Sequence, residues 1–284
     1  MPRVAVVTDS TAYLPQPLVE EYGITIAPQL LVWGDQTYHD GVDIQPDEFY
    51  SRLKTARTMP TTAQVAVITM KEIFEKLVGE GSEVLGVFIS GKFSGTMQSA
   101  IQGRELLGSA ASKVEVVDSY ASAMALGFQA LTAARAAKDG ASLGELKQLM
   151  EKSRAHIGVY FAVETLEFLH RGGRIGGAAR FIGSALNLKP ILGLRDGRIE
   201  AEDRVRTKSK AVDRVLELVD RDVRGKSNIR LATVHANAEA EAAQLLDRAA
   251  RQVGAVETVL ASLSPVVGAH TGPGTVGLAY MAGM

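Results

Sequence analysis

Short apolar runs alternate with segments of helical periodicity along the first half of the chain. The runs that predict strands are RVAVVTD (residues 3–9), ITIAPQLLVW (24–33, ended by Gly34-Asp35), EVLGVFIS (83–90) and KVEVVDS (113–119). Apolar positions at helical spacing occupy residues 46–56, 65–81, 96–107 and most of 122–156. Strands that alternate with helices in this way predict a mostly parallel sheet with helices on both of its faces.

The second half of the chain has a different pattern. IGVYFAV (157–163) predicts a strand, ETLEFLHR (164–171) a short helix, and GGRIGGAARFIGSALN (172–187) is rich in glycine and alanine. KPILGLRDGRIEAEDRVR (189–206) predicts a hairpin that turns at Asp196-Gly197. A helix over 208–223, a strand over 229–235, a further helix and two strands follow. We therefore expect two α/β domains, residues 1–156 and 157–284.

Composition and charge exclude several classes of protein. The 284 residues are 46% hydrophobic and 22% charged, and 31 basic against 32 acidic residues leave a net charge of −1. No global field attracts nucleic acid, so we expect no nucleic-acid partner. The absence of cysteine excludes disulfides and a cysteine nucleophile, and five scattered histidines without H-x-x-x-H spacing predict no metal site. No apolar run approaches the roughly 18 residues of a membrane span, and MPRVAVVTDS does not resemble a signal peptide, so we expect a cytoplasmic protein.

The stretch ISGKFSGTMQSA (89–100) carries the strongest chemical signal, because a buried strand ends there in glycines and hydroxyls. A phosphate-binding loop is one interpretation, since Gly86, Gly91 and Lys92 have G-x-x-x-x-G-K spacing. Phe93, however, occupies the place of the Ser or Thr that binds magnesium, and VFIS looks like part of the strand. No G-x-G-x-x-G follows the first strand, so a dinucleotide site has little support.

A serine nucleophile is the second interpretation. Ser94, Asp118 and His270 occur in the chain order of an α/β-hydrolase triad. GKFSG lacks the strained G-x-S-x-G turn of such enzymes, Asp118 is equally explained as a helix cap, and His270 as a turn residue in the glycine loop HTGPGTVG. An esterase that uses Ser94 and His270 remains an alternative.

A pocket of hydroxyl groups for an anion is the third interpretation. Thr61 or Thr62 precedes a predicted helix as a candidate N-cap, and Ser94 and Thr96 lie at the start of another. Free amides and the helix dipole favour an anion at such starts. Two of them that face each other would bind a carboxylate with neutral donors.

Ordered motifs along the whole chain resemble the DegV family. VTDSTAYLP (7–15) is similar to its signature T-D-S-T-A-D-L-P, with Tyr13 in place of the usual acid. TTAQV (61–65) resembles the family's T-S-Q-P, with Ala63 and Val65 replacing serine and proline, and ISGKFSGTMQSA resembles S-G-L-S-G-T-Y-Q-S-A. VVDS, LEFLHRGGRIG, KPIL, RVRTKSKA and HTGPGTVGL follow in family order.

The resemblance implies a two-domain α/β fold over about residues 3–282, with a mostly parallel sheet flanked by helices in the N-terminal domain and a mixed sheet in the C-terminal one. It implies a long-chain fatty acid buried between the domains, with its carboxylate at Thr62 and Ser94 and with His270 nearby. Members of the FakB group present the bound carboxylate to a fatty acid kinase, which makes acyl-phosphate for phospholipid synthesis. The protein would then be a carrier without further cofactors, and the kinase its partner.

The resemblance suggests a docking role for three arginines, and the glycine-rich composition suggests a lid. Arg171, Arg174 and Arg206 lie at motif positions expected to form a partner-docking face near the pocket. A glycine-rich helix should open easily, so Phe181 and Ile182 are a candidate lid over the acyl chain. The alternative is that small residues only allow close packing. A transient membrane contact for lipid exchange fits a carrier, and a lipid esterase or a lipid-bound regulatory module are the other functions to test.

Overall fold

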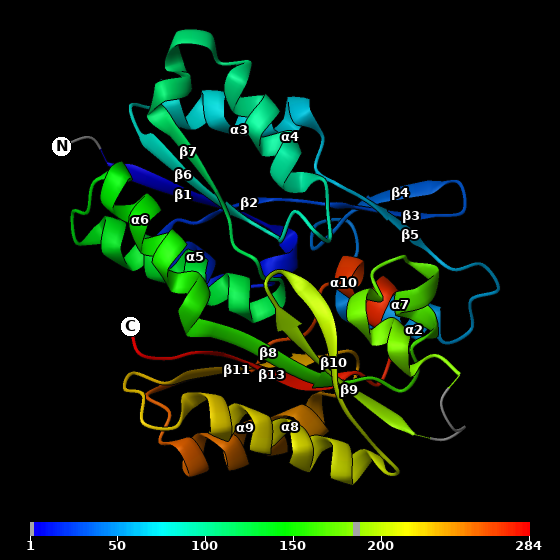
Figure 1. Cartoon of the computed structure of the whole chain (residues 1–284). Coiled ribbons are helices and arrows are strands. Elements are labelled where there is room, and N and C mark those ends of the chain that lie inside the picture. Colours follow the sequence, from blue (N-terminus) through cyan, green and yellow to red (C-terminus); the bar gives the residue numbers. More distant parts are fainter. Residues whose placement is uncertain (1–2, 184–187) are drawn as a thin grey trace.

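The computed structural model describes residues 3–183 and 188–284 and confirms the predicted α/β class (Figure 1). A four-stranded sheet in the N-terminal half is entirely parallel. Its strands, in spatial order, are β2 (Thr25–Ala27), β1 (Val4–Asp9), β6 (Glu83–Phe88) and β7 (Val114–Asp118). The helices around it are α1 (Gln16–Tyr22), α3 (Val67–Gly79), α4 (Thr96–Glu105), α5 (Ala123–Lys138) and α6 (Leu143–Ser153). Because α3 and α4 cover one face and α5 and α6 the other, β6 is apolar on both sides.

A mixed six-stranded sheet forms the C-terminal half. Its strands, in spatial order, are β10 (Arg198–Val205), β9 (Lys189–Arg195), β8 (Ile157–Ala162), β13 (Val276–Met281), β11 (Arg230–His235) and β12 (Glu257–Val259). Only the β11–β12 pair is parallel. Side chains alternate across β8, so that Tyr160 packs towards α8 (Lys208–Val223) and α9 (Glu239–Val253), whereas Val159 and Phe161 face the N-terminal half.

Helix α5 lies between the two large sheets and contacts β1 on one side and β13 on the other (Figure 1). Eleven of its 16 residues are buried, which explains why its first nine residues, Ala123 to Leu131, are apolar except for Gln129. The main hydrophobic cluster consequently contains residues from Val4 to Met281. The domain boundary predicted at residue 156 falls at the end of η3 (Arg154–His156), directly before β8, and the two halves on either side of it share one core.

A small antiparallel sheet, β4-β3-β5, stands beside the four-stranded one. It consists of β4 (Gln36–His39), β3 (Leu30–Trp33) and β5 (Thr61–Ala63), with α2 (Pro46–Leu53), α7 (Glu167–Arg171) and α10 (Pro265–Thr271) nearby. The strand region expected over 24–33 is therefore two strands in different sheets, separated at Pro28, which cannot donate to a ladder.

The expectation that Thr61 or Thr62 caps a helix is wrong. Thr62 pairs with Leu31 of β3, and α3 begins only at Val67, where the N-cap Ala66 makes no side-chain hydrogen bond. The local pattern of two threonines before an apolar run fits a cap, but the ladder with β3 takes their backbone groups. Thr62 is therefore placed by a strand rather than by a helix end.

Residues 172–183 of the glycine-rich segment do not form an α-helix. They contain a 3₁₀ helix, η4 (Gly176–Phe181), and residues 184–187 of the predicted stretch lie outside the described part of the chain. Gly176 has a φ of +50°, and a Cβ there would overlap the carbonyl oxygen of Ile199 in β10. A Cβ at Gly177 would overlap the Glu200 carboxylate. The glycines thus allow close packing against β10, which was the alternative interpretation.

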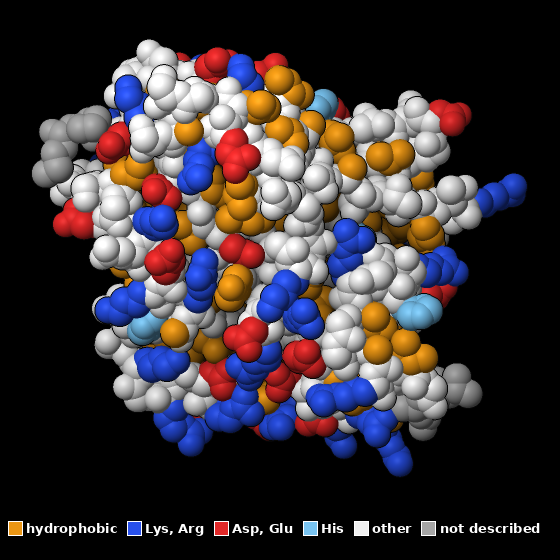
Figure 2. All heavy atoms as spheres, turned by 45° about the horizontal axis from the view of Figure 1, so that its top comes forward, with side chains coloured by type: hydrophobic (Ala, Val, Ile, Leu, Met, Phe, Trp, Pro, Cys, Tyr) orange, Lys and Arg blue, Asp and Glu red, His pale blue; other side chains and the backbone are white. Residues whose placement is uncertain are grey.

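The surface carries positive and negative side chains in similar numbers. Basic and acidic side chains are interspersed over the face drawn in Figure 2, as the 31 basic and 32 acidic residues lead one to expect.

Among helices formed by residues 3–183 and 188–284, none is both long and apolar enough to cross a membrane.

Candidate functional site

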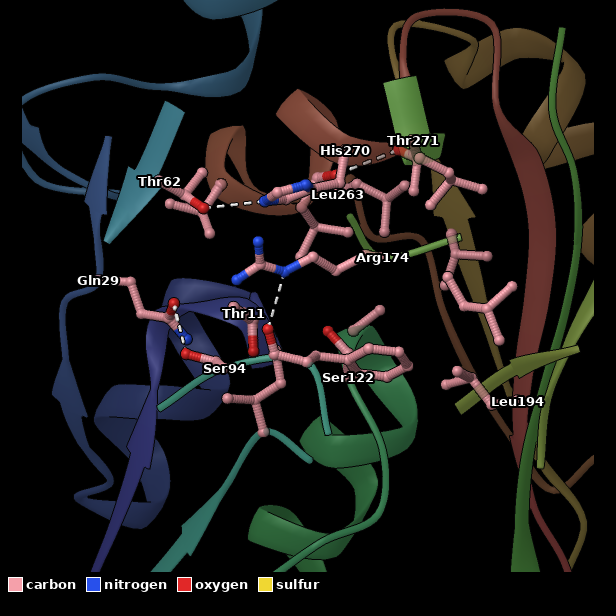
Figure 3. A pocket seen from close by; sticks show the side chains of 18 of the residues that line it. Thr11, Gln29, Thr62, Ser94, Ser122, Arg174, Leu194, Leu263, His270 and Thr271 are labelled. Atoms are coloured by element: carbon pink, nitrogen blue, oxygen red, sulfur yellow. Dashed lines mark hydrogen bonds between the residues drawn. The ribbon is translucent and has the colours of Figure 1, made fainter. Parts of the chain in front are cut away.

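A cavity of about 450 Å³ lies between the two large sheets, within the roughly 300–1,000 Å³ typical of ligand pockets. Its apolar wall comes from both halves of the chain: Ile89 and Phe93 follow β6, whereas Val159, Phe161 and Leu194 belong to β8 and β9. Polar side chains gather at one end, where Figure 3 shows Thr62, Ser94, Arg174 and His270 close together. The cavity therefore has an apolar body and a polar end.

A hydrogen bond of 2.8 Å joins the Thr62 hydroxyl to Nε2 of His270, which lies 208 residues later in the chain (Figure 3). His270 was expected in a loop, but it lies in the last turn of α10. Ser264 caps this helix through the amide of Val267, and Gly272, with a φ of +79°, follows its end. The glycine loop therefore starts two residues later than expected, and the helix directs the imidazole at β5.

The His270 imidazole is neutral at physiological pH. Burial, and to a smaller extent the positive charge of Arg174, lowers the pKa of His270 to about 4. Its Nδ1 atom is buried and has no hydrogen-bond partner within the described residues. A Cβ at Gly172 would overlap Nδ1, although the φ of Gly172 is an ordinary −74°. Close approach of the ring, rather than backbone conformation, is what requires a glycine there.

Ser94 lies at the start of α4, as predicted. Its hydroxyl accepts a hydrogen bond from the Thr96 amide at 3.2 Å and contacts the Thr96 hydroxyl at 2.9 Å. A longer bond of 3.5 Å reaches Oε1 of Gln29, which also lines the cavity. Gln29 was missed, because nothing in the sequence around it distinguishes it from an ordinary polar loop residue.

Arg174 has a different place from the one its motif suggested. Expected on a docking face near the pocket, it lines the cavity, where its Nε donates to the Phe93 carbonyl at 2.9 Å and one terminal nitrogen donates to the Gly172 carbonyl at 2.7 Å. Figure 3 shows its guanidinium between the Thr62–His270 pair and Ser94. Among the described residues that line the cavity it is the one cation, so the polar end has a positive charge that sequence reasoning had left out.

The remaining candidates of the docking face and lid lie outside the cavity lining. Arg171 is exposed and pairs with Glu167 one turn earlier in α7, and Arg206 is exposed just before α8. Phe181 packs against the main core, with the guanidinium of Arg204 5.2 Å from its ring centre, and Ile182 is 51% exposed. Their docking and lid roles stay predictions.

The residues proposed for a serine triad and for a phosphate-binding loop do not have the arrangement that either chemistry requires. Asp118 accepts hydrogen bonds from the amides of Gly91 and Tyr120, at 3.0 and 2.9 Å, so it stabilises turns and caps no helix. His270 bonds to Thr62 and not to Ser94, so the three residues of the proposed triad are not linked. Gly86 lies inside β6, which rules out a phosphate-binding loop there. Throughout residues 3–183 and 188–284, no group of three or more His, Cys, Asp or Glu could hold a metal ion.

Two buried carboxylates behind the polar end hold its loops in place. Asp9, fully buried at the end of β1, accepts from the amides of Thr11 and Ile89 and from the side chain of Gln29. Asp40 accepts from the Ser10 hydroxyl at 2.7 Å and from the amide of Val266 in α10 at 3.3 Å. Burial raises the pKa of Asp9, and it raises the pKa of Asp40 to about 6.

The family model and the curated relatives agree on one family. The family model described as "Uncharacterised protein, DegV family" matches residues 3–283. Protein DegV of Bacillus subtilis is 35% identical over 280 residues, which cover 98% of this chain and 99% of that protein.

Solved structures resemble the whole fold. A DegV family protein from Thermus thermophilus, whose structure is described as showing fatty acid binding, has 35% identity and a TM-score of 0.93 over 99% of both chains. A stearic acid-binding protein from Eubacterium ventriosum has 25% identity and a TM-score of 0.91, over 99% of this chain and 98% of that one.

The protonation of His270 provides a test of the site's electrostatics. We expect its imidazole to titrate near pH 4 in an NMR titration, and Arg174→Gln to raise that value because one cause of the shift is removed. The unfolded chain takes up this proton near the ordinary pKa of 6.5, whereas the folded chain takes it up only near 4, so this group lowers stability as the pH falls through that interval. Titration of His270 near 6.5 in the wild type would contradict the geometry.

Proposed function

The chain belongs to the DegV family, and from that premise we propose that it binds a long-chain fatty acid in the cavity between its two large sheets. The carboxylate lies at the polar end, with Thr62 and Ser94 as donors and His270 and Arg174 beside it. The observation that carries this proposal is that one cavity combines an apolar body with a polar end, where hydroxyls lie next to a neutral imidazole and one cation. The descriptions of the Thermus and Eubacterium structures support it.

The apolar body accounts for the affinity of such a ligand. Each buried CH₂ contributes roughly 0.8 kcal/mol, so a sixteen-carbon chain gains on the order of 12 kcal/mol before ordering costs. An unpaired carboxylate at the buried end would offset several kcal/mol of this gain. The ligand is therefore an amphiphile whose one polar group has to be fully hydrogen-bonded.

The polar end has donors of the right kind for that group. With the proton of His270 on Nε2, the Thr62 hydroxyl accepts it and donates its own hydrogen to the ligand. Ser94 accepts from the Thr96 amide, and it would exchange its long bond of 3.5 Å to Oε1 of Gln29 for one to the ligand. Arg174 compensates the negative charge, while two of its donors are already engaged by backbone carbonyls. A carboxylate with these partners needs no metal and no further cofactor.

The role that follows is that of a carrier rather than an enzyme. We propose that this protein presents the bound carboxylate to a fatty acid kinase, which forms acyl-phosphate for lipid metabolism, with Arg171 and Arg206 on the docking face and Phe181 and Ile182 as a lid. The protein would act in the cytoplasm and contact membranes transiently during lipid exchange. An esterase would need His270 to serve Ser94, whereas the imidazole bonds to Thr62 and has too low a pKa to be an effective base near neutral pH.

Mass spectrometry of an organic extract tests the proposal directly. We expect the purified protein to release about one long-chain fatty acid per chain, because the cavity is apolar and large enough to retain one through purification. Added palmitic acid should also bind to delipidated protein in calorimetry. A protein that neither carries nor binds a fatty acid would contradict the proposed function.

Substitution of the two hydroxyl residues tests the position of the carboxylate. Thr62→Val and Ser94→Ala should each weaken palmitate binding by about 1–3 kcal/mol, roughly 5- to 150-fold, since a buried acceptor loses one donor. Ser109→Ala, at an exposed serine, is the matched control. Thermal unfolding in parallel separates this effect from the loss of about 1 kcal/mol expected when the Thr96 amide at the start of α4 no longer has the Ser94 hydroxyl as its acceptor. Unchanged affinity in both variants would place the carboxylate elsewhere.

Phosphorylation of the bound acid tests the docking face. Arg206→Ala should leave palmitate affinity unchanged, because Arg206 does not line the cavity, but slow acyl-phosphate formation by a fatty acid kinase at least severalfold. Arg224→Ala, at an exposed arginine beyond the other end of α8, is the control. Equal rates for both variants and the wild type would remove Arg206 from the docking face.

A further inference from the structure

A second cavity, of about 260 Å³, adjoins the first at the end away from the polar residues. Val159 and Leu194 line both cavities and therefore form the partition between them. Figure 3 shows Leu194 on the opposite side of the first cavity from Thr62 and Gln29. A hydrocarbon chain whose carboxylate lies at Thr62 would thus run towards this partition.

The second cavity has room for hydrocarbon because short side chains form much of its wall. Ala121 lines it from the loop before α5, Ala125 from the first turn of α5, and Ile157 from β8. Its polar groups are Tyr120, Arg154 and Asp196. The guanidinium of Arg154 is already engaged, since its Nε donates to the Asp118 carbonyl at 2.8 Å and its centre lies 4.4 Å from the centre of the Tyr120 ring.

The backbone that carries Leu194 is fixed at the tip of the β9–β10 hairpin. The turn at Asp196-Gly197 has positive φ values of 46° and 76°, as the sequence predicted for a hairpin. The Ser90 hydroxyl donates to the Gly197 carbonyl at 2.9 Å, and Lys92 donates to the Asp196 carbonyl at 2.8 Å. The hairpin tip is therefore attached by hydrogen bonds to the loop that contains Ser94. The Leu194 side chain, which forms part of the partition, thus projects from a backbone whose position is fixed.

The segment opposite the hairpin has an unusual backbone. Tyr120 and Ala123 have φ values of +56° and +52°, a region that residues other than glycine rarely adopt. Ser122 and Ala123 line the first cavity, whereas Tyr120 and Ala121 line the second. Backbone strain of this kind persists where the surrounding structure imposes it, often at ligand-binding sites.

We propose that Leu194, together with Val159, sets the upper limit of acyl chain length in this protein, and that the second cavity is an acyl subsite closed off by the Leu194 side chain. The inference rests on the proposed fatty-acid-binding function and adds to it the residue that selects among chain lengths. A smaller side chain at position 194 joins the two cavities and lets a longer acid bind.

Binding of saturated fatty acids of increasing length tests this inference. Wild-type protein and Leu194→Ala, both delipidated, would be offered an equimolar mixture of even-numbered acids from C14 to C24, and the retained acids identified by mass spectrometry. Each further buried CH₂ strengthens binding about fourfold, so the variant should prefer acids two carbons longer than the wild-type optimum by about fifteenfold. Val159→Ala gives the same readout through the other partition residue if Leu194→Ala does not fold.

Two further variants separate a subsite from general loosening of the core. Leu194→Ala/Ala125→Leu should return the length optimum to that of the wild type, because the new leucine fills the second cavity. Leu149→Ala, at a partly buried leucine that packs against the same core cluster but lines neither cavity, should leave the optimum unchanged.

The outcomes distinguish this inference from the function on which it rests. A shift to longer acids that Ala125→Leu reverses supports the subsite. An unchanged length optimum in Leu194→Ala and Val159→Ala, while every variant still binds fatty acid, overturns the inference alone. Failure of the wild type to retain any acid overturns the proposed function and the inference with it.

Discussion

The buried carboxylate of Asp9 is the constraint on which the polar end of the cavity depends. A carboxylate taken out of water has to receive hydrogen bonds, and those that Asp9 receives come from the amide and hydroxyl of Thr11, the amide of Ile89 and the side chain of Gln29. These residues belong to three separate loops, of which the one with Ile89 continues to Ser94. Satisfying one desolvated group therefore aligns the ends of β1 and β6 with the loop before β3, and Gln29 then also meets Ser94.

Asp40, a second buried carboxylate, connects the polar end to the C-terminal half in the same way. It joins Ser10, next to Asp9, to the amide of Val266 in α10, and α10 carries His270 to Thr62. The neutral imidazole is thus placed through Asp40, which does not line the cavity, and Ser94 is linked to Asp9 through Gln29, which does. Because their positions are fixed by hydrogen bonds to backbone amides rather than by contacts with a ligand, the polar end is organised before any ligand binds.

How much of this the sequence revealed depends on the range of the interactions involved. The hairpin at Asp196-Gly197 and the helix at Lys208–Val223 follow from local signals, and the structure has both. Thr62 as a cap and His270 as a loop residue were wrong, because β3 and the packing of α10 decide their places over long separations in the chain. Arg174 could be recognised as a motif residue, but which way its side chain turns depends on the carbonyls of Phe93 and Gly172.

The burial of α5 between both sheets has a consequence for how the cavity is filled. A hinge that parted the two halves would expose a helix with 11 of its 16 residues buried, at a cost comparable to unfolding the protein. The chain should therefore unfold in a single cooperative transition, and neither half should be stable when expressed without the other. Entry and release of a ligand then depend on brief local openings at the rim of the cavity, which cost less free energy than global unfolding.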